Sequence, residues 1–199
     1  MISKPKFKIC RRLGPGVYDK CQTTKFSTST KGSMGNKRPK ALSEYGTQFL
    51  EKQKVRLSYG VSERQLSNYV KKATAIKGTH TTEKFYEDLE SRLDNVIYRT
   101  GLGSTRRASR QMVSHGHFLV NDRKVTIPSY EMKVGDVIKI REGSKSSKLF
   151  TDLAAKLKDH VAPTWIFFDI NKMEGKVLAK AKNVETFLNL NAVLEFYSR

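Results

Sequence analysis

The spacing of apolar residues changes at Gly116, and this change limits the folds that the chain can adopt. Residues 104–115 place their apolar side chains at helical intervals, whereas residues 118–127 form two short apolar runs around an Asn-Asp turn pair, as a β-hairpin does. Residues 137–140 add another short strand. Two short helices followed by about three short strands are therefore expected within residues 93–140, which predicts an α+β fold.

The residues before this region predict a helical body. Ser62 to Gln65 have the form of a capping box, and the apolar spacing that follows predicts a helix closed by Gly78. Residues 48–57 contain no helix breaker and predict a shorter helix. A further helix capped by Thr81 or Thr82 is expected to reach Gly101 and is long enough to be two helices, and Ser104 is expected to cap the next one. After the hairpin region we expect a helix over 148–161, a strand over 165–169 and a weaker strand over 173–178. The apolar element over 192–197 is undecided in type, with helix favoured.

The charge of the chain indicates what it binds. Lysine and arginine number 38 against 19 acidic residues, which gives a net charge of +19. Residues 1–60 alone carry 14 basic and 3 acidic residues, a net of +11. So large an excess is usually neutralised by a polyanion, most often nucleic acid. Residues 20–40 are rich in Ser, Thr, Gly and Lys and have almost no apolar side chain, so they predict either an extended basic arm or a flexible linker.

Several function classes are disfavoured. No apolar run approaches the roughly 18 residues that a membrane span requires, and no secretory leader is evident, so we expect a soluble, intracellular protein without a membrane partner. The phosphate-loop, Gly-x-Ser-x-Gly and His-Glu-x-x-His patterns are absent from the sequence, so we expect no enzyme, no catalytic residue and no cofactor. Cys10 and Cys21 argue against a disulfide framework in an intracellular protein, although their redox state stays open, and they lack partners for a zinc site.

The helix expected after Ser104 carries the sharpest functional signal. Arg106, Arg107 and Arg110 lie within about one turn, and guanidinium groups bind phosphate oxygens in pairs. Many arginines with few aromatics suit double-stranded RNA, which is read through its backbone and shape. The competing interpretation is a solvated helix surface. Tyr98 and His115 could stack on bases, but local packing is the favoured interpretation for both.

The chain resembles a known family over nearly its whole length. The matching segments, in order, are Tyr45-Gly46, Glu51 to Arg56, Tyr59-Gly60-Val61, Glu63-Arg64-Gln65, Arg92 to Arg99, Ala108 to His115, Val120-Asn121, Val134 to Val137, Pro163-Thr164-Trp165, Lys172 to Gly175, and Glu195 to Arg199. Together they resemble ribosomal protein four of the bacterial small subunit. Some members have a four-cysteine zinc site near the N-terminus, but here Phe7 stands where one of those cysteines would be, so no metal is expected.

The resemblance implies a role, a set of contacts and a domain layout. It implies a structural constituent of the small subunit that binds 16S-type rRNA, nucleates assembly and contributes, with ribosomal proteins three and five, to the place where mRNA enters and to translational accuracy. The expected location is the ribosome of the cytoplasm or of an organelle. The expected rRNA contacts are Lys52, Lys54, Arg56, Arg92, Arg99, Arg106, Arg107, Arg110, Gln111, His115, Arg123 and Lys124, and the expected mRNA contacts are Lys37, Arg38 and Lys40.

The expected domains are an extended basic arm (1–41), a helical body (42–91), an inserted RNA-binding module of two helices and a short-stranded antiparallel sheet (92–157), and a segment that returns to the helical body (158–199). Two alternatives stay open at this point. An RNA-modifying enzyme or a heat-shock RNA-binding protein could carry the same module, and a nucleoid protein would show no preference for folded RNA over duplex DNA.

Overall fold

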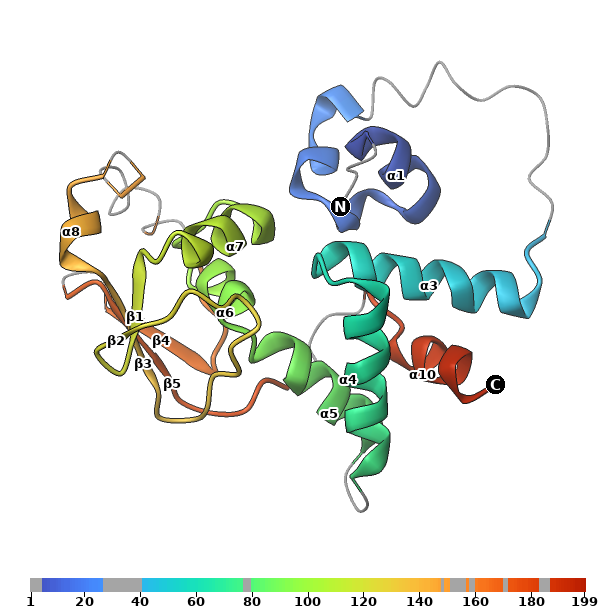
Figure 1. Cartoon of the computed structure of the whole chain (residues 1–199). Helices are drawn as coiled ribbons and strands as arrows, with labels where there is room; N and C mark the ends of the chain where they lie inside the picture. Colours follow the sequence, from blue (N-terminus) through green and yellow to red (C-terminus); the bar gives the residue numbers. More distant parts are fainter. Residues whose placement is uncertain are drawn as a thin grey trace. The chain divides into compact units, whose positions relative to one another are not determined.

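The chain forms two compact units, Met1–Lys77 with Val184–Arg199, and Gly78–Asn183. The computed structural model describes residues 5–26, 41–76, 80–147, 149–150, 157, 160–169, 172–182 and 187–199. Each unit is described in turn, and Figure 1 gives the labels of their helices and strands.

The first unit is built around helices α3 (Glu44–Ser58), α4 (Glu63–Ala75) and α10 (Leu190–Ser198). Figure 1 shows the red C-terminal helix α10 beside α3, to which it is joined by many contacts. The capping box of α4 is confirmed, since Gln65 N donates to Ser62 Oγ and Ser62 N donates to Gln65 Oε1. Helix α3 is longer than expected because Ser43 caps it, with Gly46 N donating to Ser43 Oγ. The preference for helix at the C-terminus is also confirmed.

The N-terminal part of this unit differs from the expected extended arm. It contains α1 (Lys6–Leu13) and two 3₁₀ turns, η1 (Pro15–Val17) and η2 (Asp19–Gln22), gathered around a small apolar core. Cys10 and Cys21 lie in that core and are joined by a disulfide, which the sequence argued against. The expected extended arm is wrong over residues 5–26, because Leu13, Val17, Phe26 and the two cysteines form a small buried core. Residues 27–40 of the expected arm lie outside the described residues.

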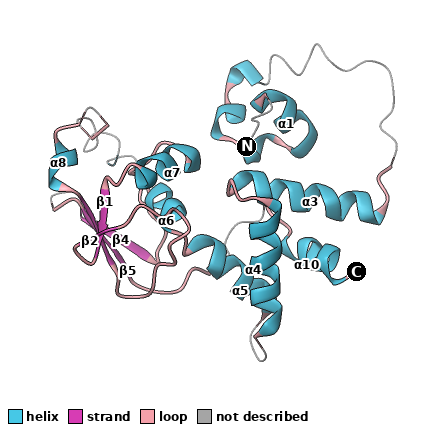
Figure 2. Ribbon diagram, in the orientation of Figure 1, coloured by secondary structure: helices cyan, strands magenta, loops and turns pink. Residues whose placement is uncertain are grey.

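The second unit begins with helices and ends with a sheet, as Figure 2 shows in cyan and magenta. Its helices are α5 (Thr81–Glu90), α6 (Leu93–Arg99), α7 (Arg106–Ser114) and the single turn α8 (Glu142–Lys145). Two expected caps are wrong by one residue. Helix α5 is preceded by His80, so Thr81 is already helical, and α7 is capped by Thr105 because Ala108 N donates to Thr105 Oγ1.

The sheet has the order β2-β1-β3-β5-β4, and all its neighbours are antiparallel. Its strands are β1 (Phe118–Val120), β2 (Arg123–Lys124), β3 (Val137–Ile140), β4 (Ile166–Asp169) and β5 (Glu174–Val177). The turn between β1 and β2 has positive φ at both Asn121 and Asp122, as a type I′ hairpin turn requires. The expected hairpin, third strand and later pair of strands are therefore confirmed.

The expected boundary at residue 158 is not where the unit ends. Strand β5 pairs with β3 and with β4, so β4 and β5 complete the module's sheet instead of returning to the helical body. Within the C-terminal segment it is α10 that packs on α3. The helix expected over 148–161 lies largely outside the described residues. Within the part of the chain that the structure describes, no helix is both long and apolar enough to cross a membrane.

Candidate nucleic-acid interface

Two buried carboxylates underlie the arginines of the second unit. Glu90 ends α5 and is 0% exposed, and Asp94 lies in the first turn of α6 and is also buried. A buried carboxylate left without a partner costs several kcal/mol, so each of these groups must hold a cation or several hydrogen-bond donors. The arginines predicted to bind RNA supply those cations.

Arg92 is held entirely inside the unit. Its Nε lies 3.0 Å from Asp94 Oδ1 and its Nη2 lies 2.7 Å from Asp94 Oδ2, and the residue is 1% exposed. A guanidinium in this position cannot reach an RNA phosphate. The prediction that Arg92 contacts RNA is therefore corrected, because the charge of Asp94 holds this side chain in the core.

Arg99 and Arg106 are held at the surface by the other carboxylate and its neighbours. Arg99 donates to both oxygens of Glu90, at 2.8 and 3.0 Å. Arg106 Nε donates to Asn95 Oδ1 at 2.8 Å, and Asn95 in turn donates to Glu90 Oε2. The Arg106 guanidinium also lies 4.6 Å from the ring centroid of Tyr98, so this aromatic packs locally, as favoured.

Arg110 completes this set. Its Nη1 lies 3.4 Å from Asp94 Oδ2, while its side chain is still 40% exposed. We call Arg99, Arg106 and Arg110 the anchored arginines, because a buried acid or its amide neighbour fixes each side chain. Their side chains are nonetheless 18 to 40% exposed, so part of each guanidinium remains available to a phosphate.

Beside the anchored arginines lies a set of exposed polar and basic residues. We call it the exposed rim, and its members are Arg107, Gln111, His115, Arg123 and Lys124. The first three follow one another along the solvent side of α7 and its C-terminal turn. The last two lie on β2, and the Lys124 side chain passes so close to Gly116 that a Cβ there would lie 2.4 Å from Lys124 Cε. The hairpin and the end of α7 therefore present their cations together.

A pair of histidines lies at the end of this rim. The rings of His115 and His117 are 6.0 Å apart, and His117 Nδ1 lies 2.9 Å from Ser144 Oγ. Partial burial lowers the pKa of His117, and the positive charges of His115 and Arg141 lower it further. Arg141 therefore adds its charge to this edge of the unit.

Close packing fixes the angle at which α7 begins. Gly103 precedes the helix, and a Cβ at this position would lie 2.1 Å from Ser109 Oγ. Ser109 Oγ in turn donates to Thr105 O. A residue larger than glycine would thus push the first turn of α7 away, together with Arg106.

The first unit uses its predicted RNA-binding cations differently. Lys52 Nζ lies 2.8 Å from Glu63 Oε1 and 4.2 Å from the ring centroid of Phe196, with Phe49 and Tyr197 also close. The Lys52 side chain is only 8% exposed. This placement contradicts the expected RNA contact, since its ammonium group is surrounded by aromatic rings and a carboxylate of its own unit.

The other predicted residues of this unit are partly available. Lys54 is half-buried, pairs with Glu51 and lies over the Phe187 ring. Arg56 is half-buried near Glu63, whose carboxylate feels its charge. The mRNA contacts expected at Lys37, Arg38 and Lys40 lie outside the described residues.

Metal binding has no support within the described ranges. Among those residues, no group of three or more His, Cys, Asp or Glu side chains could hold a metal ion. The histidines near α7 face a serine and each other instead of carboxylates.

Sequence reasoning missed the groups that hold the arginines in place. Glu90, Asp94 and Asn95 were not predicted to take part, although Glu90 follows the buried Leu89, and Asp94 and Asn95 lie between the buried Leu93 and Val96. An acidic side chain on the apolar side of a helix is the signal that could have revealed them, because such a group must be paired. Arg141 was also missed, and it lies outside any arginine-rich run.

The chain matches two family profiles and full-length relatives. The profile of the S4 domain matches residues 91–138, and that of the ribosomal protein S4/S9 N-terminal domain matches residues 2–90. The chain is similar to small ribosomal subunit protein uS4 of Syntrophomonas wolfei, with 40% identity over 96% of this chain and 95% of the relative. It is also similar to the uS4 proteins of Acetivibrio thermocellus, with 41% identity over 96% of each chain, and Limosilactobacillus fermentum, with 41% identity over 98% and 97%. The chain therefore belongs to the ribosomal protein S4 family, whose members are structural and non-enzymatic components of the small ribosomal subunit.

Proposed function

We propose that this protein binds small-subunit rRNA directly, with the anchored arginines and the exposed rim of the second unit forming the contact surface. The observation that carries the proposal is the buried pair Glu90 and Asp94, which fixes three arginines at one surface. Arginines fixed in this way lose little side-chain entropy when a phosphate binds, so they suit an RNA backbone of defined shape.

The surface favours recognition of shape over recognition of bases. Its groups are guanidinium, ammonium, amide and imidazole, and the nearest aromatic ring, Tyr98, lies against Arg106. Folded RNA presents phosphates and 2′-hydroxyls at fixed positions, which these donors can match. The alternative of an RNA-modifying or heat-shock protein that borrows the module is disfavoured, since the relatives match 96 to 98% of this chain and not the module alone.

A salt titration tests the proposed surface. In Arg107→Ala/Lys124→Ala, the slope of log affinity against log salt for an rRNA transcript with a five-helix junction should fall by about 1.5, or 0.7 to 0.9 per lost phosphate contact. The charge-matched control is Lys172→Ala/Lys182→Ala. Both lysines are exposed, and Lys172 follows β4, at the opposite edge of the sheet from β2. Equal slopes for the two double variants would sink the assignment.

The finer role that we propose concerns assembly and decoding. We propose that the protein nucleates assembly at an rRNA helix junction, lies beside ribosomal proteins three and five in cytoplasmic ribosomes, and contacts mRNA through Lys37, Arg38 and Lys40 where mRNA enters. The support is the charge of this segment, which has four cations and no acid over residues 31–40. A triple alanine variant should leave rRNA affinity nearly unchanged and alter miscoding in a reporter assay. Normal accuracy and normal mRNA unwinding would contradict the mRNA contact.

A further inference from the structure

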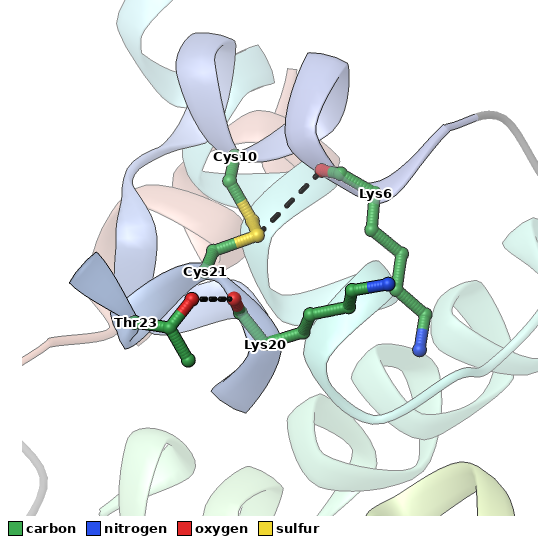
Figure 3. Close-up of a disulfide and its surroundings, with 5 residues drawn as sticks. All are labelled: Lys6, Cys10, Lys20, Cys21 and Thr23. Carbon is green, nitrogen blue, oxygen red and sulfur yellow. Dashed lines mark hydrogen bonds between the residues drawn. A yellow bond between two sulfur atoms is a disulfide. The ribbon is translucent and has the colours of Figure 1, made fainter. Parts of the chain in front are cut away.

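The N-terminal cluster, residues 5–26, is cross-linked between two of its turns. Cys10 lies on α1 and Cys21 on η2, and the disulfide between them closes a short loop with a sequence separation of 11 (Figure 3). Both cysteines are deeply buried, with 2% and 1% exposure. The carbonyl oxygen of Lys6 lies 3.8 Å from Cys21 Sγ, where the thiol of the reduced form could donate a hydrogen bond.

The buried core of the cluster is small. It has five buried side chains, Cys10, Leu13, Val17, Cys21 and Phe26, and two of these are the cysteines. Partly buried side chains pack around it, from the cluster itself (Phe7, Ile9 and Tyr18) and from α3 of the same unit (Leu50 and Leu57). So small a core rarely holds a fold without a cross-link or a metal. Removal of the cross-link should therefore loosen this cluster before any other part of the first unit.

The cluster presents a basic helix face to solvent. Lys8, Arg11 and Arg12 are all exposed and recur at i, i+3 and i+4, whereas Cys10 and Leu13 point into the core. Lys20 and Lys25 are exposed as well, and Asp19 is the single acidic residue in the sequence from 5 to 26. The spacing of the basic face is fixed only while α1 is held by the cluster.

We propose that this basic face, defined by Lys8, Arg11 and Arg12, is a second surface for the phosphate backbone of folded RNA, and that the Cys10–Cys21 cross-link governs its affinity. The inference rests on the proposed function, because it assumes an RNA ligand. Cross-linking is a thiol–disulfide exchange with a small disulfide such as oxidised glutathione. The two thiols lose two protons and two electrons to form one S–S bond, and the small disulfide gains them and leaves as two thiols.

The cross-link acts through the shape of the face and leaves its charge unchanged. The same cations are present in both redox states, so a purely electrostatic attraction would not change. In the reduced state the cluster must be ordered as RNA binds, and that cost is subtracted from the binding free energy. We expect the oxidised protein to bind the junction transcript about tenfold more tightly, which corresponds to about 1.4 kcal/mol.

The experiment compares full-length protein in three forms: oxidised, reduced, and the variant Cys10→Ala/Cys21→Val, which keeps the core apolar but cannot cross-link. Each form is titrated with the junction transcript, and limited proteolysis reports opening of residues 5–26. The reduced form and the variant should bind about tenfold more weakly and be cut sooner near α1. In the oxidised background, Lys8→Ala/Arg12→Ala should lower the salt slope by about 1.5, whereas Lys172→Ala/Lys182→Ala should not.

The outcomes separate the two proposals. Equal affinity in all three forms, with an unchanged slope for Lys8→Ala/Arg12→Ala, overturns the inference and leaves the second-unit surface intact. Binding that is lost in every form, including the oxidised wild type, means that the proposed rRNA function itself has failed. A tenfold loss that the cysteine variant shares with the reduced protein supports the cross-link as its cause, since reductant cannot act on that variant.

Discussion

Two ion pairs, one in each unit, bury opposite partners. In the Arg99–Glu90 pair of the second unit the acid is buried and the base is partly exposed: Glu90 is 0% exposed while the Arg99 side chain is 18% exposed. In the Lys52–Glu63 pair of the first unit the base is buried and the acid is exposed: the Lys52 side chain is 8% exposed and that of Glu63 is 47% exposed. Both arrangements count equally toward a net charge of +19, yet only the first leaves a cation where RNA can reach it.

This difference shows which basic residues suit RNA binding. A buried carboxylate costs free energy unless it is paired, so its arginine is held in one geometry. Where that arginine lies at the surface, as Arg99 does and Arg92 does not, the rest of its guanidinium faces outward. The ammonium group of a buried lysine interacts with groups of its own unit and is not available to RNA, even where the surrounding sequence is basic. The relative burial of the two partners in an ion pair therefore indicates which cations can contact RNA better than the density of positive charge in the sequence does.

The strongest test of the comparison is removal of a buried acid. Glu90→Gln keeps the shape of the side chain but leaves Arg99 without its carboxylate, and we expect a loss of about 3 to 5 kcal/mol in the free energy of unfolding of the second unit. The chain has a single tryptophan, Trp165, which is buried in that unit, so urea unfolding followed by its fluorescence reports the change.

The control for this variant is an exposed acid. Glu142→Gln removes a carboxylate whose side chain is 91% exposed and whose pair with Lys145 is on the surface. It should change the unfolding free energy by less than about 0.5 kcal/mol. A similar loss in both variants would mean that Glu90 does not anchor the arginines.

A smaller effect is expected where the buried partner is the base. Lys52→Met preserves the aliphatic stem but removes the ion pair with Glu63 and the cation–π contacts with Phe196, for an expected loss of about 1 to 2 kcal/mol in the first unit. Hydrogen exchange of the α10 amides measures this loss, with Lys71→Met on the exposed side of α4 as the control. The salt slope of RNA binding should not move, and a drop of about 0.8 would restore Lys52 to the RNA contacts.

Much of the fold could be predicted from the sequence because it depends on local patterns. The capping box at Ser62 and the hairpin turn at Asn121 are local signals, and both are found as predicted. The pairing of β3 with β5 could not be predicted in the same way, because it joins residues nearly forty positions apart. Because of this pairing, the module ends beyond the boundary expected at residue 158.

The site shows the same limit. The exposed members of the arginine helix, such as Arg107, could be predicted from composition and helical spacing. Arg92 and Lys52 cannot be distinguished from exposed cations by sequence. They are buried because Arg92 pairs with Asp94 and Lys52 packs on Phe196 of a distant helix. Sequence spacing identifies a basic face, and only packing decides which of its cations remain at the surface.

The stability of the first unit at low pH gives a smaller test of its ion pair. Burial alone would raise the pKa of Glu63, but hydrogen bonds from Lys52 and Tyr197 and the charges of Lys52 and Arg56 outweigh it, so the pKa is lowered. A lowered carboxyl pKa stabilises the folded state above the pKa of the unfolded chain, and this stabilisation is lost as the pH falls through the folded value. Between pH 5 and 3, hydrogen exchange of the α10 amides should show a loss of protection of less than about 1 kcal/mol. The part of this loss that comes from protonation of Glu63 should be absent in Glu63→Gln.

A pair of conservative substitutions separates charge from geometry within α7. Arg107→Lys retains the charge of a residue on the exposed rim, so both the unfolding free energy and the RNA affinity should stay within about 0.5 kcal/mol of the wild type. Arg106→Lys also retains the charge, but it loses the planar fork that bonds Asn95 Oδ1 and lies over the Tyr98 ring. If anchoring matters, the salt slope should stay the same in both variants while affinity falls about tenfold in Arg106→Lys alone. Equal affinity in the two variants would mean that RNA binding depends only on the charge of the surface. Anchoring of the arginines would then have no effect on RNA affinity.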